Sequence, residues 1–133
     1  MQELILDGKR IHSLETFWDE FERHLIRGVF WGRNLDAFND VLRGGFGTPP
    51  GGFILRWENS EWSRAMLGYP ETERQLKLRL TLCHPSNLQT VTDQLRRAQA
   101  RVGPTVFDWL VEIIEVHGAG GEEAKDNVTL ILA

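Results

Sequence analysis

Residues 30–42 read FWGRNLDAFNDVL and carry the strongest pattern in the chain. Asn34 is a residue type that caps helix N-termini, and the apolar spacing after it predicts an amphipathic helix to about Arg43. The apolar residues of this helix share one side: Leu35, Phe38, Val41 and Leu42. Asp36 and Asp40 fall about 40° apart on the opposite side, so two carboxylates project together into solvent.

This pair of carboxylates has an ordinary and a functional interpretation. Asp36 lies in the first turn of the predicted helix, where its negative charge offsets the helix dipole. Asp40 lies one turn further on, where a second like charge is mildly unfavourable. A solvated helix face explains most such pairs, whereas a functional pair would present two fixed negative charges to a partner.

Phe30 and Trp31 stand just before the helix, between Gly28 and Gly32. Aromatic residues supply much of the energy at interface centres, so at least one of these rings could be an exposed anchor beside the acids. Packing of both rings under the connecting segment is the ordinary alternative.

Three apolar runs, at residues 3–6, 53–57 and 128–132, predict strands, and the second has the look of a buried one. Helical patterns fill the intervals, and each interval is long enough for a crossover connection. The sequence therefore predicts an α/β fold with a three-stranded parallel sheet covered by helices.

The other predicted helices have recognisable ends. Ser13 caps a helix with the apolar stripe Leu14, Phe17, Trp18, Phe21 and Leu25. A short helix begins at Asn59 or Ser60 and is stopped by Gly68 and Pro70. A helical pair over residues 73–101 is split at His84 and Pro85, and a last helix has Pro104 in its first turn.

Length and composition limit the class of protein. The 133 residues suit a single domain over residues 1–133. The single cysteine excludes an intrachain disulfide framework and a Cys-rich zinc site, which favours a reducing compartment. No apolar stretch has the length of a membrane span, and the N-terminus lacks a signal-peptide pattern, so we expect a cytoplasmic protein without membrane contact.

The charge of the chain is unevenly distributed. The net charge of −4 argues against a domain that binds nucleic acid directly by neutralising phosphates. Residues 1–106 hold 13 acidic and 14 basic side chains, whereas residues 107–133 hold six acidic and one basic. The acidic C-terminal segment would widen a negative face if it lay beside the helix of residues 34–43.

No residue pattern indicates catalysis, a cofactor or a metal. The chain lacks HExxH, P-loop and GxSxG motifs. Cys83 and His84 are adjacent, and adjacent side chains rarely face each other, so a half-buried structural thiol is the simpler interpretation. The helix acids have no histidine at helical spacing, and Gly44–Gly47 leads to prolines and a strand instead of the helix that a phosphate loop requires.

The pattern of residues 30–42 resembles the signature of the barstar family of ribonuclease inhibitors: aromatic, aromatic, Gly, x, Asn-Leu-Asp-Ala-Leu, x, Asp, x, Leu. Residues 4–11, 53–57 and 128–132 resemble the first, second and last strands of that family in the same order. The resemblance covers residues 2–67 and 105–133. Residues 70–103 look like an inserted helical pair.

The resemblance implies a non-enzymatic inhibitor that plugs the basic active-site groove of one ribonuclease, whether the cell's own enzyme or a toxin. Asp36 and Asp40 match the two helix acids that meet the enzyme's phosphate-binding cations, and Asp40 would be the main phosphate mimic. Phe30 matches an interface tyrosine. The contact segment would also include Trp31, Gly32 and Arg33.

Three further positions follow from the resemblance. Asn39 stands where the family has an interface tryptophan, and Phe30 lacks the tyrosine hydroxyl, so the aromatic half of the site is altered. A further family acid aligns with Glu115, with Glu112 as a rival. The alternatives are a protein-binding module of the same fold with another partner and, less favoured, a small hydrolase.

Overall fold

The computed structural model describes residues 1–133 and has the predicted sheet at its centre. Strands β1 (Glu3–Asp7), β2 (Phe53–Glu58) and β3 (Val128–Leu132) pair in parallel, in the order β1-β2-β3. Leu55 in the central strand pairs with Leu4 on one side and Leu130 on the other. The α/β fold class is therefore confirmed.

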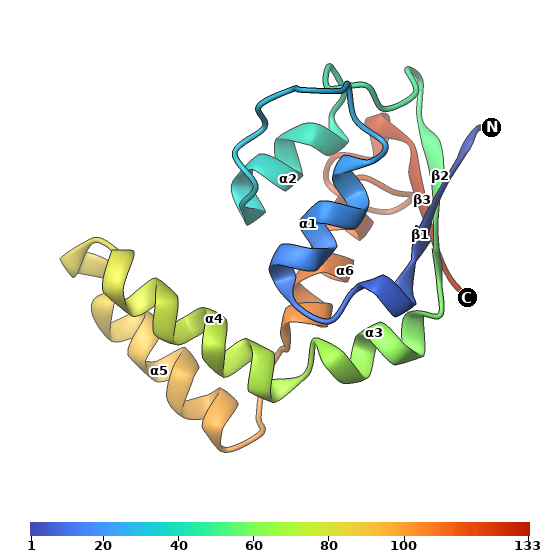
Figure 1. Cartoon of the computed structure of the whole chain (residues 1–133). Coiled ribbons are helices and arrows are strands. Elements are labelled where there is room, and N and C mark those ends of the chain that lie inside the picture. The colour runs from blue at the N-terminus through green and yellow to red at the C-terminus, as the bar shows by residue number, and fades with distance from the viewer.

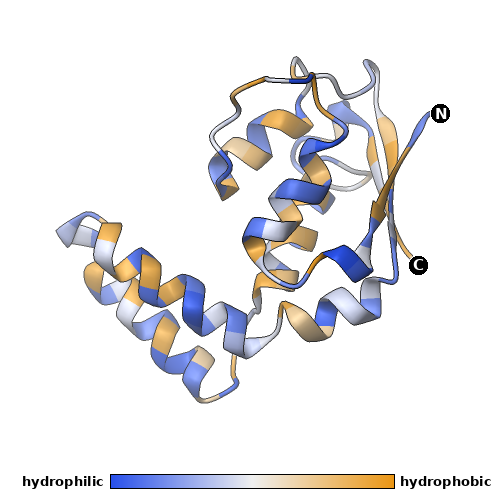
Figure 2. Ribbon diagram, viewed as in Figure 1, coloured by the Kyte–Doolittle hydropathy of each residue, from blue (hydrophilic) through white to orange (hydrophobic).

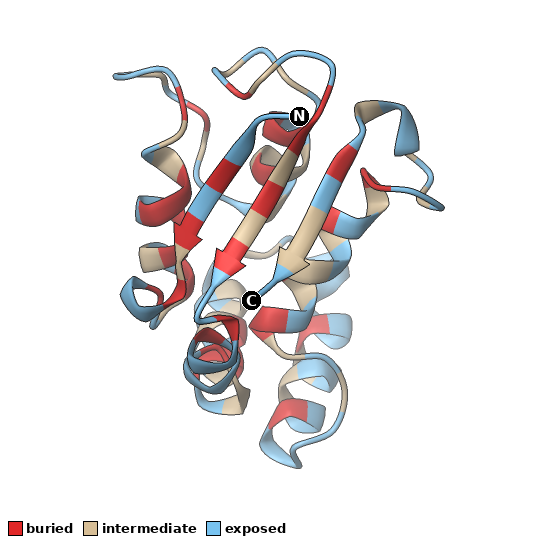
Figure 3. Ribbon diagram, turned by 90° about the vertical axis from the view of Figure 1, so that its right-hand side faces the viewer, coloured by how far each residue is buried: buried red, intermediate tan, exposed pale blue.

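The helices cover one face of the sheet (Figure 1), and Figure 3 shows the other face, which no helix covers. Alternate residues of β2 are buried, at Phe53, Leu55 and Trp57, whereas Ile54 and Arg56 between them are partly exposed. The expectation of a buried strand thus holds for one face only. The side chains of β2 are buried on one face of the sheet and partly exposed on the other.

Three helices pack on the covered face: α1 (Leu14–Glu22), α2 (Leu35–Leu42) and α6 (Val106–Val116). Ser13 and Thr16 form a capping box at the start of α1, and Asn34 accepts a hydrogen bond from the Ala37 N–H at the start of α2. Leu25 lies beyond the end of α1 but is still buried, so the predicted helix was too long by about one turn.

Aromatic rings fill the space between these helices and the sheet. The main core contains 21 buried residues. The Phe38 ring of α2 lies 5.4 Å from the Phe17 ring and 5.0 Å from the Phe21 ring, both of α1. Phe17 in turn lies 5.1 Å from Trp57 of β2. Helix α2 is therefore fixed to the rest of the domain by large, fully buried contacts.

The remaining helices depart from the core. Helix α3 (Ser60–Met66) leads to α4 (Tyr69–Leu82), and α5 (Leu88–Gln99) returns beside it. Figure 1 shows α4 and α5 as an arm that projects from the domain, and Figure 2 shows hydrophobic residues on both of its helices. The arm has a small core of its own, in which the buried residues are Leu76, Val91 and Ala98.

Two predicted helix boundaries were wrong. Pro70 lies in the first turn of α4 and so begins a helix, because proline fits the position where no backbone donor is needed. Thr105 caps α6, with its side chain accepting from the Asp108 N–H, and Pro104 lies before the cap. Helices α4 and α5 together run from Tyr69 to Gln99, close to the insertion expected at residues 70–103.

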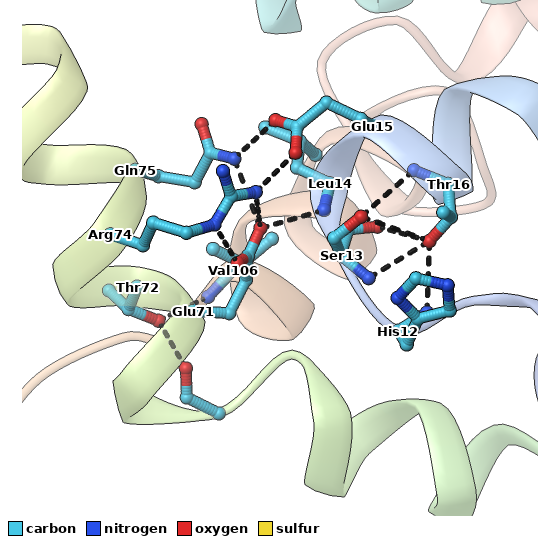
Figure 4. Close-up of polar contacts among 11 residues, drawn as sticks. His12, Ser13, Leu14, Glu15, Thr16, Glu71, Thr72, Arg74, Gln75 and Val106 are labelled. Atoms are coloured by element: carbon cyan, nitrogen blue, oxygen red, sulfur yellow. Dashed lines mark hydrogen bonds and ion pairs between the residues drawn. The ribbon is translucent and has the colours of Figure 1, made fainter.

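A buried carboxylate joins the arm to the domain (Figure 4). Glu71 of α4 accepts hydrogen bonds from the Leu14 N–H at the start of α1 (2.8 Å) and from Arg74 Nε (2.6 Å). Gln75 bridges Glu71 and Glu15 of α1, and Arg74 also pairs with Glu15. Burial alone would raise the pKa of Glu71, but the hydrogen bonds from Arg74, Leu14 and Gln75 hold that pKa below its ordinary value.

A second link fixes the other side of the junction. Thr72 of α4 accepts a hydrogen bond from the Val106 N–H at the start of α6, at 2.9 Å. The Tyr69 hydroxyl donates to the Gly103 carbonyl oxygen, at 2.8 Å. The arm is thus attached to both α1 and α6 by polar groups, which fixes its angle to the sheet.

Candidate partner-binding face

Helix α2 presents both predicted acids to solvent. Phe38, Val41 and Leu42 are buried, whereas Asp36 and Asp40 are exposed. Asp36 lies in the first turn of the helix, where the backbone N–H groups favour a negative charge. The two carboxylates therefore lie on a helix whose opposite side is held by the core.

The two acids differ in their partners. Asp36 forms no ion pair within the chain. Asp40 accepts a hydrogen bond from Arg43 Nη1 at 2.6 Å, and Arg43 Nη2 lies 3.4 Å from Oε1 of Glu123. Arg43 thus bridges α2 to the loop between α6 and β3. The spacing of three residues between Asp40 and Arg43 was a signal for this pair that the sequence interpretation overlooked.

The segment before α2 separates its two aromatic side chains. Phe30 is 91% exposed, whereas Trp31 is only 4% exposed. The Trp31 ring packs 5.2 Å from the Trp18 ring, and its Nε1 donates to Oε1 of Glu22 at 3.0 Å. Of the two rings only that of Phe30 is available to a partner, and Trp31 anchors the segment.

Gly32 and Arg33 shape this segment. Both residues have positive φ angles, of +90° and +49°, and a Cβ at Gly32 would lie 3.1 Å from the Ala37 Cβ. Arg33 pairs with Asp19 at 2.6 Å and with Glu22 at 3.0 Å. The hydrogen bond to Asp19 raises the pKa of the Arg33 guanidinium, against the opposing effect of burial. Arg33 therefore binds α1, which gives it a structural role that the sequence did not indicate.

Asn39 also has a partner inside the chain. Its Oδ1 lies 2.7 Å from Nε2 of His117, a fully buried residue directly after α6. The other ring nitrogen of His117 lies 2.6 Å from Oδ2 of Asp126. Asn39, His117 and Asp126 therefore form a polar chain that ties α2 to the C-terminal loop. No local sequence signal joins these residues, because they come from three separate segments.

The acidic C-terminal segment lies partly beside α2. Helix α6 packs against α2, and the loop that follows it places Glu123 next to Arg43. Glu112 and Glu115 are both exposed on α6 and both line a groove of about 780 Å³ with the loop at Gly118–Glu122. Glu115, with Glu112 as its rival, stays a prediction for the third acidic contact.

Cys83 and His84, which are adjacent in the sequence, contact different groups. Cys83 is half-buried beside the small core of the arm, whereas the His84 ring bonds the Ser86 hydroxyl. No group of three or more His, Cys, Asp or Glu side chains is arranged to hold a metal ion. None of the helices has both the length and the apolar character needed to span a bilayer.

Comparison with known proteins gives two matches. The family described as "Barstar (barnase inhibitor)" matches residues 1–80, which include β1, β2, α1 and the whole of α2. The "Putative ribonuclease inhibitor YrdF" of Bacillus subtilis (strain 168) is 34% identical over 68 residues, which are 51% of this chain and 71% of the relative. The family match therefore includes the helix with the two exposed acids.

Proposed function

Since this chain belongs to the Barstar family, whose description is barnase inhibitor, we propose that it inhibits a ribonuclease by blocking its active site. In this proposal Asp36 and Asp40 of α2 occupy the positions of RNA phosphates. The observation that carries the proposal is their placement: two carboxylates one turn apart, exposed on a helix whose other side is buried. The complex contains one inhibitor and one ribonuclease.

The chemistry of a ribonuclease explains why such acids inhibit it. The enzyme stabilises phosphate charge with fixed cations, and carboxylates at phosphate-like positions form charge-assisted hydrogen bonds with the same groups. Because α2 is held by the main core, its acids need little further ordering when they bind. The negative charge also accelerates the encounter with a basic active site.

Arg43 makes Asp40 less accessible than Asp36 to the cations of an enzyme. It pairs with Asp40 in the free protein, so the cations of the enzyme compete with Arg43 at that carboxylate. An exposed pair of this kind contributes only about 0–1 kcal/mol, so a desolvated enzyme arginine can replace it. Arg43 then remains near Glu123. Asp36 needs no such exchange.

Phe30 provides the apolar part of the contact. Its exposed ring buries a large area when an enzyme covers it, as aromatic anchors at interfaces do. Trp31, Gly32, Arg33 and Asn39 support the contact from within by fixing the segment and the helix. Glu115 adds negative charge at the edge of the face.

The proposal is tested by inhibition and capture. The wild-type protein, the Asp36→Ala/Asp40→Ala variant and the control Glu61→Ala are titrated into an RNA-cleavage assay with barnase, and immobilised to capture ribonuclease activity from the source organism. Glu61 is an exposed acid on α3, away from α2. We expect inhibition by the wild type and control only. Absence of ribonuclease inhibition and capture by the wild type would refute the function, and equal inhibition by the double variant would refute the site.

A further inference from the structure

A groove separates the arm from α2. Its volume is about 670 Å³, and α1 forms its floor through residues that include Leu14 and Trp18. The start of α2 forms one wall with Leu35 and Asp36, and α4 forms the other with Leu78 and Leu82. Figure 1 shows the arm and α2 on the same side of α1. One of the two candidate binding acids therefore lies on the rim of this groove.

The wall on α4 carries two exposed leucines, beside Gln75 and Arg79. Leu78 is 47% exposed and Leu82 is 84% exposed, one turn apart. They are offset by two residues, about 200° around the helix, from Leu76 and Leu80, which pack in the small core of the arm. The arm therefore uses one side of α4 to hold α5 and leaves an apolar side open toward α2.

The width of the groove is fixed in the free protein. Glu71, with its hydrogen bonds to Leu14, Arg74 and Gln75, holds α4 against the start of α1. Thr72 holds α4 against the start of α6. Since both walls are positioned in advance, a partner that fits the groove loses little free energy in ordering it.

One carboxylate of the groove is free to bind a cation of a partner. Arg33 is engaged by Asp19 and Glu22, and the Arg79 guanidinium lies 5.1 Å from the centre of the Trp109 ring. Arg74 pairs with Glu71 and Glu15. Of the two acids that line the groove, Glu15 pairs with Arg74 and Asp36 has no ion pair in the chain, so the Asp36 carboxylate is available to a cation beside Leu78 and Leu82.

We propose that the groove between α2 and α4 is a second contact surface for the ribonuclease that α2 inhibits. It takes a projecting loop at the edge of the basic active site, with an apolar side chain against Leu35, Leu78 and Leu82 and a cation beside Asp36. The arm thereby lengthens the contact face on one side of α2. This inference rests on the proposed function, because it names the same enzyme as the occupant.

The test compares three proteins against the ribonuclease that the wild type inhibits. Leu78→Gln/Leu82→Gln changes the α4 wall, and Leu88→Gln is the matched control, because Leu88 is 50% exposed on the arm but does not line the groove. We expect the groove variant to bind about tenfold more weakly, mainly through faster dissociation, and the control to bind like the wild type. All three should unfold at the same denaturant concentration.

Cys83 gives a second, direct measurement, since it lines the groove and is the only cysteine of the chain. We expect the rate of its alkylation to fall when the wild-type protein is saturated with the ribonuclease. Unchanged alkylation and unchanged dissociation of the groove variant, with inhibition still dependent on Asp36 and Asp40, would overturn this inference while leaving the proposed function intact. A dimer of the free protein that Leu78→Gln/Leu82→Gln dissociates would overturn it in favour of a second copy of the chain.

Discussion

Helix α2 and the α4–α5 arm border the same groove, but they are held in place by different forces. The buried side of α2 is part of the 21-residue core, with Phe38 among the rings of α1. The arm has three buried core residues, and its junction with the domain depends on Glu71 and Thr72. The comparison teaches that a rigid surface can be fixed by apolar burial or by a satisfied polar network.

The two modes differ in their response to conditions. Apolar packing depends little on pH, whereas a buried carboxylate stabilises the fold only while it is ionised. The following substitutions test this contrast between α2 and the arm, in order of decreasing effect.

Truncation of Phe38 should have the largest effect. Phe38→Ala removes a fully buried ring between α1 and α2, and we expect a loss of about 3–5 kcal/mol in the free energy of unfolding. Urea unfolding followed by tryptophan fluorescence measures this change. A loss below about 1 kcal/mol would mean that the core does not fix α2.

Removal of the charge of Glu71 should have the second largest effect on stability, and only at pH values at which the carboxylate is ionised in the wild type. Glu71→Gln keeps the shape of the side chain but loses its charge-assisted hydrogen bonds, so we expect a loss of about 2 kcal/mol at neutral pH. The folded pKa of Glu71 is below the unfolded one. Its contribution is therefore complete above the ordinary pKa of 4.5 and disappears as the pH falls through the folded pKa.

Urea unfolding of the wild type and Glu71→Gln from pH 7 to pH 2 provides the measurement. The two curves of stability against pH should converge at low pH. Glu73→Gln, on the same helix but less buried, is the matched control and should follow the wild type. A constant difference between the wild type and Glu71→Gln at every pH would contradict the polar mode of attachment.

Substitution of Asn39 tests whether this residue stabilises the fold or contacts the partner. Asn39→Ala leaves Nε2 of the buried His117 without its partner, so we expect a loss of about 1–2 kcal/mol in stability. The affinity for the ribonuclease should change only slightly. The opposite result, full stability with much weaker binding, would mean that Asn39 contacts the enzyme directly. Chemical unfolding and inhibition titrations separate the two outcomes.

Arg43 should have the smallest effect on stability. Arg43→Ala removes an exposed bridge between Asp40 and Glu123, so the free energy of unfolding should change by less than about 0.5 kcal/mol. It also frees the Asp40 carboxylate, one turn from Asp36, so we expect a few-fold faster association with the ribonuclease at low salt. The gain should diminish as salt is added, because exposed charges are screened. Slower association would indicate that Arg43 itself contacts the enzyme.

Much of the fold could be predicted from the chain. Alternating helix and strand patterns gave the parallel sheet, and the caps at Ser13 and Asn34 gave the starts of α1 and α2. The uncovered face of the sheet could not be predicted, because the apolar run at β2 contains Ile54 on the open side. The short helix ends at Met66 as expected, but α4 begins at Tyr69 and not at Glu73, because Pro70 fits the first turn of a new helix. Pro104 lies before the Thr105 cap and not inside the first turn of α6.

The site was predictable where it depends on a single helix. The exposure of Asp36 and Asp40 follows from their angle to Phe38 and its apolar neighbours. The roles of Trp31 and Asn39 did not follow from their positions, because each depends on a residue elsewhere: Glu22 for Trp31 and His117 for Asn39.

The sequence by itself indicated the family through the resemblance of residues 30–42 to its signature, and it indicated the parallel sheet and the two acids of α2 through periodicity within short segments. Only the tertiary structure decided that Arg43 forms an ion pair with Asp40, that Phe30 and not Trp31 is exposed, and that the arm forms a groove beside Asp36. These features depend on contacts between residues far apart in the chain. Such contacts are set by how the faces of different elements meet, which the pattern of any one segment does not specify.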